Sequence, residues 1–328
     1  MTPVELSRTV LYAVRCAVDD GELSVSVPAR AVVAPPGPGG RGDYATNIAL
    51  QLARPAGRPP LDVAEILRPR IRDVDGVCDV EITGPGFLNI HLEPATATAA
   101  LVAEILDGPE AYGCVARPAR GAVALRIPFD VRAEVVADAL VRIIATQGGR
   151  AEVEHVRPGE SAGLRPVPAP EDPAPLGADA ARWALLHPAP HDRPRITADH
   201  LVQGESNPLF RVRYAHARSR ALGRNAVRLG FGPVPGDCEV PESAALVRAL
   251  AEYPHALAQA ADHRAPDRLA RQLVRVADAL LAFQHTVLPL GDEKPSAAHR
   301  ARLALAEAAG TVLAGGLSLL GISAPDYL

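Results

Sequence analysis

The feature that most limits the fold of this chain is the helical periodicity of its C-terminal half. Such spacing places apolar side chains on one face of a helix, and Pro or Gly residues separate the periodic segments. The segments are residues 178–186, 209–229, 242–249, 266–288 and 296–313. Because helices with one apolar face bury it against each other, residues 176–328 are predicted to form an all-α helix bundle.

The first third of the chain mixes two periodicities. Residues 4–18, 61–70 and 96–106 follow helical spacing, whereas residues 77–82 and 87–92 alternate in the manner of strands. A Gly-Pro-Gly sequence joins the two alternating segments, which is typical of a hairpin-type connection. An α+β domain is therefore predicted over residues 1–117.

The middle of the chain is short. Residues 122–127 and 150–156 read as strands and residues 133–146 as a helix, which together make one βαβ-like unit. Residues 157–175 are rich in Pro, Gly and Glu and are predicted to be a linker. A complete doubly wound nucleotide-binding domain needs well over ~100 residues, which residues 118–175 cannot supply.

Composition excludes several classes of function. The four cysteines form no CxxC pair and the ten histidines show no metal-ligand spacing, so no metal and no cofactor are expected. No apolar run approaches the ~20 residues that a membrane span requires. Charged residues occupy positions 1–30, where a signal peptide needs an apolar core. We therefore expect a cytoplasmic protein without a membrane partner.

One helical segment carries an unusual concentration of arginine. Between Leu209 and Gly230 there are six arginines and no acidic residue, although the whole chain has a net charge of −4. On a helix, Arg213, Arg220, Arg224 and Arg228 fall on one stripe, because they are seven, four and four residues apart. Such a cationic stripe on an acidic protein is typical of contact with RNA phosphates. Solvated arginines on an ordinary amphipathic helix are the alternative.

Several short motifs are spread along the chain between residues 42 and 325. Gly-Asp-Tyr-Ala-Thr-Asn (42–47) and Gly-Pro-Gly-Phe-Leu-Asn-Ile (84–90) resemble two signatures of the additional N-terminal domain of arginyl-tRNA synthetases, and the motifs that follow occur in the same order as in that family. Asp-Ala-Ala-Arg (179–182) stands where the anticodon-binding domain has Asp-Ala-Leu-Arg. The segment from Asn207 to Arg218 resembles Asn-Pro-x-aromatic-x-Val-x-Tyr-Ala-His-Ala-Arg, and Leu-Gly-Ile-Ser-Ala-Pro (320–325) resembles the C-terminus of the family.

The resemblance implies three domains. Residues 1–117 correspond to the additional N-terminal domain and residues 176–328 to the anticodon-binding helical domain of the DALR type. Residues 118–175 then hold a vestigial βαβ remnant of the Rossmann-type class I core, followed by the Pro-rich linker. The resemblance also implies tRNA, and specifically tRNA(Arg), as the partner.

The resemblance further implies two sets of tRNA contacts. On the D-loop side these are Phe87 and Asn89, since a ring stacks on an exposed base while an amide reads its edge. Without the resemblance, Phe87 would be assigned to the core and Asn89 to a turn. The anticodon-side contacts are Arg213, Tyr214, Arg220, Arg224, Arg228 and Tyr327. Tyr214 is equally suited to packing inside its helix.

The catalytic motifs of the family are altered or missing. Where the family has Pro-apolar-His-Val-Gly-His, this chain has Asp130 at the first histidine and lacks the Gly-His step. The only lysine is Lys294, so the family's lysine-containing loop, which stabilises charge on pyrophosphate, cannot precede it. From these observations we predict no catalytic residue and a protein that is not an aminoacylating enzyme.

Three hypotheses about function follow. The first is a non-catalytic tRNA-binding protein, a pseudoenzyme paralogue that recognises tRNA(Arg) and presents it to a protein partner. The second is an accessory subunit of a true synthetase, or of an enzyme that uses arginyl-tRNA, which docks through apolar surface where a catalytic domain once packed. The third is an enzyme with new chemistry in the remnant cleft, although Asp130, Glu134, Asp138 and His155 form no recognisable catalytic set.

Overall fold

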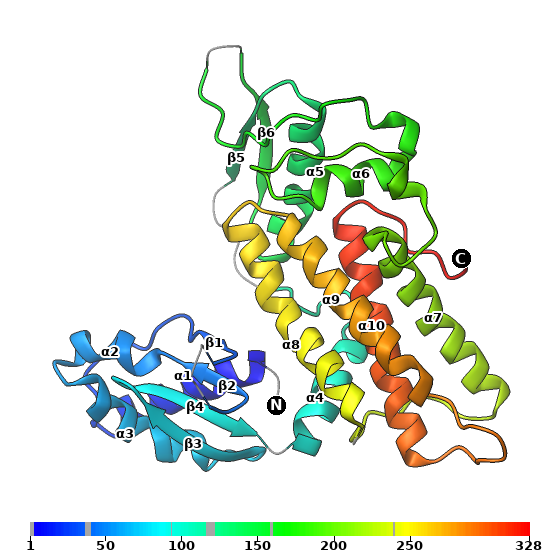
Figure 1. The fold of residues 1–328 in the computed structure, drawn as a ribbon. Coiled ribbons are helices and arrows are strands. Elements are labelled where there is room, and N and C mark those ends of the chain that lie inside the picture. The colour runs from blue at the N-terminus through cyan, green and yellow to red at the C-terminus, as the bar shows by residue number, and fades with distance from the viewer. Residues whose placement is uncertain (1–2, 37–40, 93, 116–121, 158–159, 239) are drawn as a thin grey trace. The chain divides into compact units, whose positions relative to one another are not determined.

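The computed structural model describes residues 3–36, 41–92, 94–115, 122–157, 160–238 and 240–328. The chain divides into two compact units, which are residues 1–103 with 235–238 and residues 104–234 with 239–328. Among the described residues, the first unit holds a four-stranded sheet and the second holds a two-stranded sheet and most of the helices (Figure 1). No helix in these ranges is long and apolar enough to cross a membrane.

The first unit is an antiparallel sheet covered on one face by helices. The strand order is β1-β2-β4-β3. Alternation along β4 directs Leu88 and Ile90 into the core and Phe87 and Asn89 to the opposite face. The elements are α1 (Pro3–Asp19), β1 (Val33–Ala34), β2 (Tyr44–Thr46), α2 (Ile48–Ala56), α3 (Pro60–Arg72), β3 (Val77–Thr83) and β4 (Phe87–Leu92).

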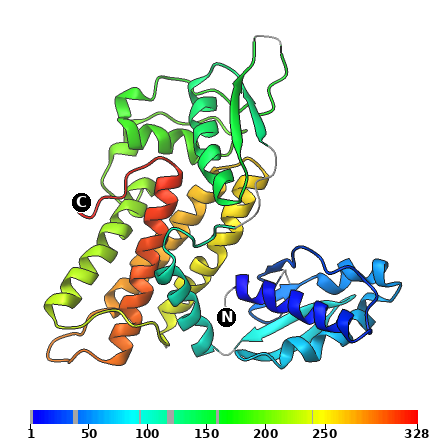
Figure 2. The same cartoon turned by 180° about the vertical axis from the view of Figure 1, so that it is seen from behind.

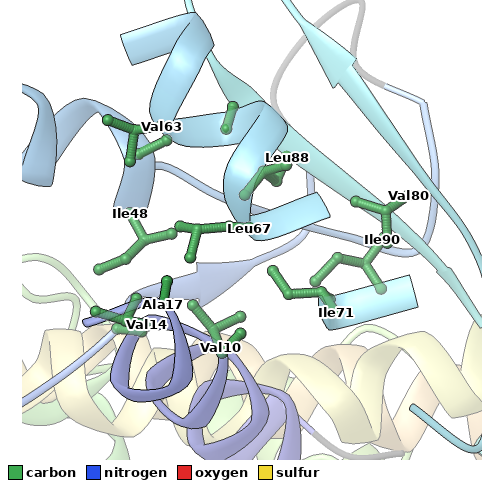
Figure 3. Packing of buried hydrophobic residues seen from close by; sticks show 14 of the residues in the cluster. Val10, Val14, Ala17, Ile48, Val63, Leu67, Ile71, Val80, Leu88 and Ile90 are labelled. Atoms are coloured by element: carbon green, nitrogen blue, oxygen red, sulfur yellow. The ribbon is translucent and has the colours of Figure 1, made fainter. Parts of the chain in front are cut away.

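The core of this unit is built from the periodic residues of both element types. Figure 3 shows Val10 and Val14 of α1 and Leu67 of α3 gathered beside Leu88 and Ile90 of β4. The predicted helices and the two longer strands are confirmed. Strands β1 and β2 were missed, because segments of two and three residues are too short to show alternation.

The turn before β4 requires glycine. Gly86 has φ +128°, and a Cβ atom there would lie 2.9 Å from the carbonyl oxygen of Pro60. Gly84 also has a positive φ, of +53°. These conformations are accessible to glycine without steric cost, which explains the Gly-Pro-Gly sequence that precedes Phe87.

The second unit begins with a βαβ arrangement beside the helix bundle. Strands β5 (Val123–Ile127) and β6 (Ala151–His155) are parallel, and α5 (Val131–Thr146) connects them. The predicted strand, helix and strand are therefore observed. Their origin as a Rossmann-type remnant stays a prediction, because two strands do not make a doubly wound sheet.

The remainder of this unit is helical, as predicted. In Figures 1 and 2, α7, α9 and α10 run side by side, and α8 packs against α9. Helix α8 continues beyond residue 249 through Pro254, because the buried Tyr253 and Leu257 hold both of its halves against the core. The helices of this unit are α6 (Ala178–Leu186), α7 (Pro208–Arg228), α8 (Pro241–Asp262), α9 (Asp267–Phe283) and α10 (Ala297–Leu319), while α4 (Pro94–Asp107) begins in the first unit and ends in the second.

The predicted Pro-rich linker is packed where it is described. The amide of Leu164 donates to the carbonyl of Arg126 at 3.1 Å, and that of Val167 donates to the carbonyl of Pro190 at 2.8 Å. These contacts hold the segment against the second unit, so the expectation of a free linker does not apply to residues 160–175. The predicted boundary at 117/118 lies outside the described residues, and the three-domain division stays a prediction.

Candidate nucleic-acid interface

On the sheet of the first unit, one of the two predicted D-loop contacts is accessible. The side chain of Phe87 is 40% exposed at the start of β4. Asn89 lies on the same face but is only 2% exposed, and its amide donates to the Thr83 hydroxyl at 2.6 Å. The structure therefore offers the ring of Phe87 to a ligand, whereas Asn89 ties β4 to β3.

In the second unit, the sequence motif at residues 207–218 builds the beginning of α7. Asn207 is the N-cap, and its side-chain oxygen accepts from the amides of Leu209 and Phe210 at 3.1 and 3.4 Å. Its amide group donates to the carbonyls of His200 and Val202. Pro208 at the first helical position completes a strong start signal.

The predicted arginine stripe exists, and the C-terminal segment of the chain lies along it. Arg220 is paired with the carboxylate of Asp326 at 3.1 Å. The guanidinium of Arg224 donates to the carbonyl of Asp326 at 3.3 Å and lies 4.2 Å from the ring centroid of Tyr327. Arg228 is exposed and has no ion pair or hydrogen bond among the described residues. The stripe is thus partly neutralised by the chain itself.

The remaining stripe residue joins three of the sequence motifs. Arg213 lies 3.8 Å from the carboxylate of Asp179 and donates to the Ser323 hydroxyl at 3.3 Å. Asp179 in turn accepts hydrogen bonds from the amide and the hydroxyl of Ser323. The aspartate of the Asp-Ala-Ala-Arg motif therefore anchors the C-terminal segment to α6 and α7.

Aromatic residues accompany the arginines. Tyr327 is 72% exposed, which leaves one face of the Arg224–Tyr327 pair open to a ligand. Tyr214 is 37% exposed and stacks on Phe210, with 5.6 Å between ring centroids. Tyr327 is therefore free to stack on a base, whereas Tyr214 already has an aromatic partner.

A groove of about 700 Å³ runs beside the stripe between α7 and α10. Arg220 and Arg224 line it together with small residues such as Gly310 and Gly315. The half-buried carboxylate of Glu307 also lines the groove, and burial raises the pKa of this group. Burial has the opposite effect on His216, which also lines the groove, and lowers its pKa. The hydrogen bond between its Nδ1 and the carbonyl of Pro325 acts to raise that pKa.

The altered catalytic motif forms the start of α5. Asp130 is its N-cap and accepts from the amides of Arg132 and Ala133 at 3.0 and 3.1 Å. Phe129 is 76% exposed and stacks on His155, which also pairs with Glu134. Within the ranges that the structure describes, no group of three or more His, Cys, Asp or Glu side chains is placed to hold a metal.

Sequence reasoning left one prominent residue of this region without a role. Arg132 is fully buried, and its guanidinium donates to the carbonyls of Val167, Leu185, Pro188, Ala189 and Asp192 at 2.7–3.0 Å. Burial lowers its pKa. The sequence contained no signal for this role, because the accepting carbonyls lie 35 to 60 residues away along the chain.

Two parts of the chain match models of known protein families. Residues 9–92 match the family described as arginyl tRNA synthetase N terminal domain, and residues 212–328 match the DALR anticodon binding domain. The chain is related to the arginyl-tRNA synthetases. The resemblance stated from the sequence motifs is therefore confirmed, and the two domains support tRNA binding.

Curated relatives carry the same family name. An arginine–tRNA ligase of Frankia alni is 26% identical over an alignment of 555 residues that covers 100% of both chains. Since this synthetase-related chain has 328 residues, that alignment contains long gaps on its side. An arginine–tRNA ligase of Renibacterium salmoninarum is 49% identical over 116 residues, which are 34% of this chain and 21% of that protein.

Solved structures share the fold. The arginyl-tRNA synthetase of Thermus thermophilus aligns with a TM-score of 0.64 at 15% identity, and that of Plasmodium falciparum with 0.63 at 9%. Each alignment covers 100% of both chains. At such low identity these matches show the fold alone.

The comparisons overturn one prediction. The chain was predicted not to be an enzyme, but its full-length relative is named an arginine–tRNA ligase and its fold is that of arginyl-tRNA synthetases. Both findings point to an enzyme. The prediction relied on the altered histidine motif, on the absence of lysine before Lys294 and on the shortness of residues 118–175. The alignment compares residues along the whole chain, so the assignment as a pseudoenzyme is withdrawn.

Proposed function

We propose that this protein binds tRNA, with a preference for tRNA(Arg), through the arginine stripe of α7 and through Phe87. The observation that carries the proposal is the pair of Arg224 and Tyr327, a guanidinium 4.2 Å from the centroid of a ring that is 72% exposed. This pair offers a base a stacking surface and a phosphate a cation at one place. Arg228, which is exposed and has no partner among the described residues, adds a second cation to the same helix.

The first unit supplies a separate contact in this proposal. The exposed ring of Phe87 stacks on an unpaired base, which in the family is a D-loop base. Asn89 acts by holding β4 through Thr83 rather than by reading the base directly, since its side chain is buried. Discrimination among tRNAs then depends on which unpaired bases reach the two aromatic surfaces.

Filter binding tests the proposal on the full chain. Labelled tRNA(Arg) is expected to bind several times more tightly than bulk tRNA at the same salt concentration. Replacing the two stripe arginines that carry no ion pair in the described part of the chain (Arg224→Gln with Arg228→Gln) should weaken binding about tenfold, since each lost phosphate contact costs affinity for every tRNA. The matched control Arg58→Gln with Arg248→Gln removes two exposed arginines elsewhere. Equal affinity for all tRNAs would contradict the preference for tRNA(Arg).

A second candidate role, that of an accessory subunit, is favoured by one observation. Phe129, Val131 and Val153 are 76%, 56% and 39% exposed at or near β5 and β6. Exposed apolar side chains in this part of the chain favour a protein partner, such as a synthetase or an enzyme that uses arginyl-tRNA, to which bound tRNA(Arg) is presented. Co-purification that is lost in Phe129→Ser with Val131→Ser would support this role, and unchanged co-purification would oppose it.

The names of the relatives suggest an activity for this chain, which is the ligation of arginine to tRNA. Arginine-dependent exchange of pyrophosphate into ATP, measured with tRNA present, tests it directly. An enzyme of this kind gives exchange that disappears when arginine is omitted. The same preparation, assayed for transfer of labelled arginine to tRNA(Arg), reports the complete reaction.

A further inference from the structure

A second cationic hollow lies where α8 ends and α9 begins. Its volume is about 430 Å³, and none of its lining residues belongs to the arginine stripe. Three arginines of α9 line it, together with the end of α8 and the segment around Pro190 and His191. The tRNA contacts proposed above do not use this hollow.

The lining of the hollow carries more positive than negative charge. Arg268, Arg271 and Arg275 lie three and four residues apart on α9 and therefore share one face. Arg268 is bonded to the neutral side chain of Gln259 at 2.8 Å, so it keeps its full charge. Arg275 is 66% exposed and lies 3.6 Å from Glu252, an exposed ion pair that contributes little. Asp267 is the only acidic residue in the lining.

Asp267 gives the hollow a second chemical property. Asp267 is only 3% exposed, and one of its carboxylate oxygens pairs with Arg271 at 3.1 Å. The other oxygen, Oδ1, is buried without a hydrogen-bond partner. A buried carboxylate oxygen is expected to have a donor, and leaving it without one is costly. Asp267 lines the hollow, so a rotation of its side chain would bring Oδ1 to the hydroxyl of a ligand bound there, which would supply this donor.

One wall of the hollow is fixed before any ligand arrives. The buried guanidinium of Arg132 donates to the carbonyls of Pro188, Ala189 and Asp192, which flank the wall residues Pro190 and His191. A buried cation is tolerated only where its donors are satisfied, so these bonds hold the segment in one conformation. A preorganised wall reduces the entropy lost on binding.

We propose that this hollow binds a ribose phosphate, with Arg268, Arg271 and Arg275 holding the phosphate and Asp267 accepting a ribose hydroxyl. Guanidinium groups suit phosphate because they donate two parallel hydrogen bonds. A carboxylate with a free acceptor distinguishes ribose from its deoxy counterpart, because only ribose carries the hydroxyl donor. The group comes either from a free nucleotide or from the backbone of RNA.

Calorimetric titration of the full chain with AMP, 2′,3′-dideoxy-AMP and inorganic phosphate tests the proposal. AMP is expected to bind saturably, and the dideoxy compound and phosphate each to bind about tenfold more weakly. The charge-removing variant Arg268→Gln with Arg275→Gln should weaken the binding of AMP at least tenfold. The control variant Arg58→Gln with Arg248→Gln, which has the same net charge, should leave AMP binding unchanged.

A second variant tests the role of Asp267. In Asp267→Asn the amide oxygen would turn toward Arg271 and its NH2 group toward the hollow, so the acceptor is lost. AMP and the dideoxy compound should then bind equally, whereas wild type distinguishes them. The proposal would be overturned if AMP did not bind saturably, or if both arginine double variants weakened AMP binding equally. It would also be overturned if Asp267→Asn still preferred AMP to the dideoxy compound. Displacement of AMP by polyglutamate at equal charge concentration would do the same.

Competition with tRNA identifies the source of the ribose phosphate. If tRNA displaces AMP, and Arg268→Gln with Arg275→Gln also weakens tRNA, the hollow holds the RNA backbone. If AMP and tRNA bind together, it holds a free nucleotide. Because the AMP titrations contain no RNA, their result does not depend on whether the tRNA interface proposed above is right.

Discussion

The guanidinium of Arg132 is a buried cation whose hydrogen bonds all end on backbone carbonyls. Arg132→Gln should therefore lower the free energy of unfolding of the second unit by about 3 kcal/mol, since several buried carbonyls lose their donor. Urea unfolding measures the change. The exposed Arg248→Gln is the control and should stay within about 0.5 kcal/mol of wild type. A similar result for both variants would show that the buried bonds contribute little.

His216 predicts a dependence of stability on pH. Burial lowers its pKa below the ordinary value of 6.5, so the unfolded chain takes up a proton before the folded chain does. The stabilisation is present above pH 6.5 and is lost as the pH falls from there through the lowered value. His216→Gln should therefore lose less unfolding free energy than wild type does between pH 7.5 and 5.5.

Comparing wild type with this variant isolates the histidine. Burial raises the pKa of Asp267 and of Glu307, so these groups favour the folded state as the pH falls. Their contribution is common to both proteins and cancels in the difference. Identical pH profiles for wild type and His216→Gln would contradict the prediction.

At the scale of elements, the C-terminal segment occupies part of the α7 surface that is proposed to bind RNA. Asp326 pairs with Arg220 at 3.1 Å, and an exposed pair of this kind is worth up to about 1 kcal/mol. Asp326→Asn should therefore tighten tRNA binding by about two- to fivefold in filter binding at 0.1 M salt. Asp292→Asn removes an exposed carboxylate elsewhere and controls for net charge. Equal tightening by both variants would assign the effect to net charge alone.

Apolar periodicity predicted the boundaries of some helices correctly and those of others wrongly. Helix α7 was predicted within one residue at each end, because its apolar periodicity is bounded by Asn207-Pro208 and by Gly230. Helix α8 was predicted to end at residue 249, although it continues to Asp262. Tertiary packing of Tyr253 and Leu257 outweighed the disruptive effect of Pro254.

At the scale of the whole molecule, the two proposed tRNA surfaces belong to different units. Phe87→Ala should weaken tRNA binding about tenfold through lost stacking, with little change in its dependence on salt. Arg224→Gln with Arg228→Gln should lower the slope of log affinity against log salt by about 2. Because the sites share no contact partners, the losses should multiply in the combined variant. If the combined variant bound tRNA as tightly as the more weakly binding of the two separate variants, only one surface would engage tRNA.

The sequence by itself determined most of the helices, the longer strands and the location of charge. Helix and strand periods follow from local spacing, so they fixed the helix bundle, the antiparallel pair β3–β4 and the βαβ unit. The stripe on α7 follows from the spacing of its arginines on a regular helix. The absence of lysine before Lys294 was equally plain in the sequence, yet as an argument about activity it was outweighed by similarity along the whole chain.

Only the tertiary structure decided which of these residues are accessible and what they contact. Arg213 meets a serine 110 residues away, and Arg220 meets an aspartate 106 residues away. Asn89 lies on the same face of β4 as Phe87 but is buried there against Thr83. Such contacts depend on packing between segments far apart in the chain, and local spacing carries no information about them. The pattern therefore located the arginine stripe, whereas packing decided that the chain's own C-terminal segment covers it.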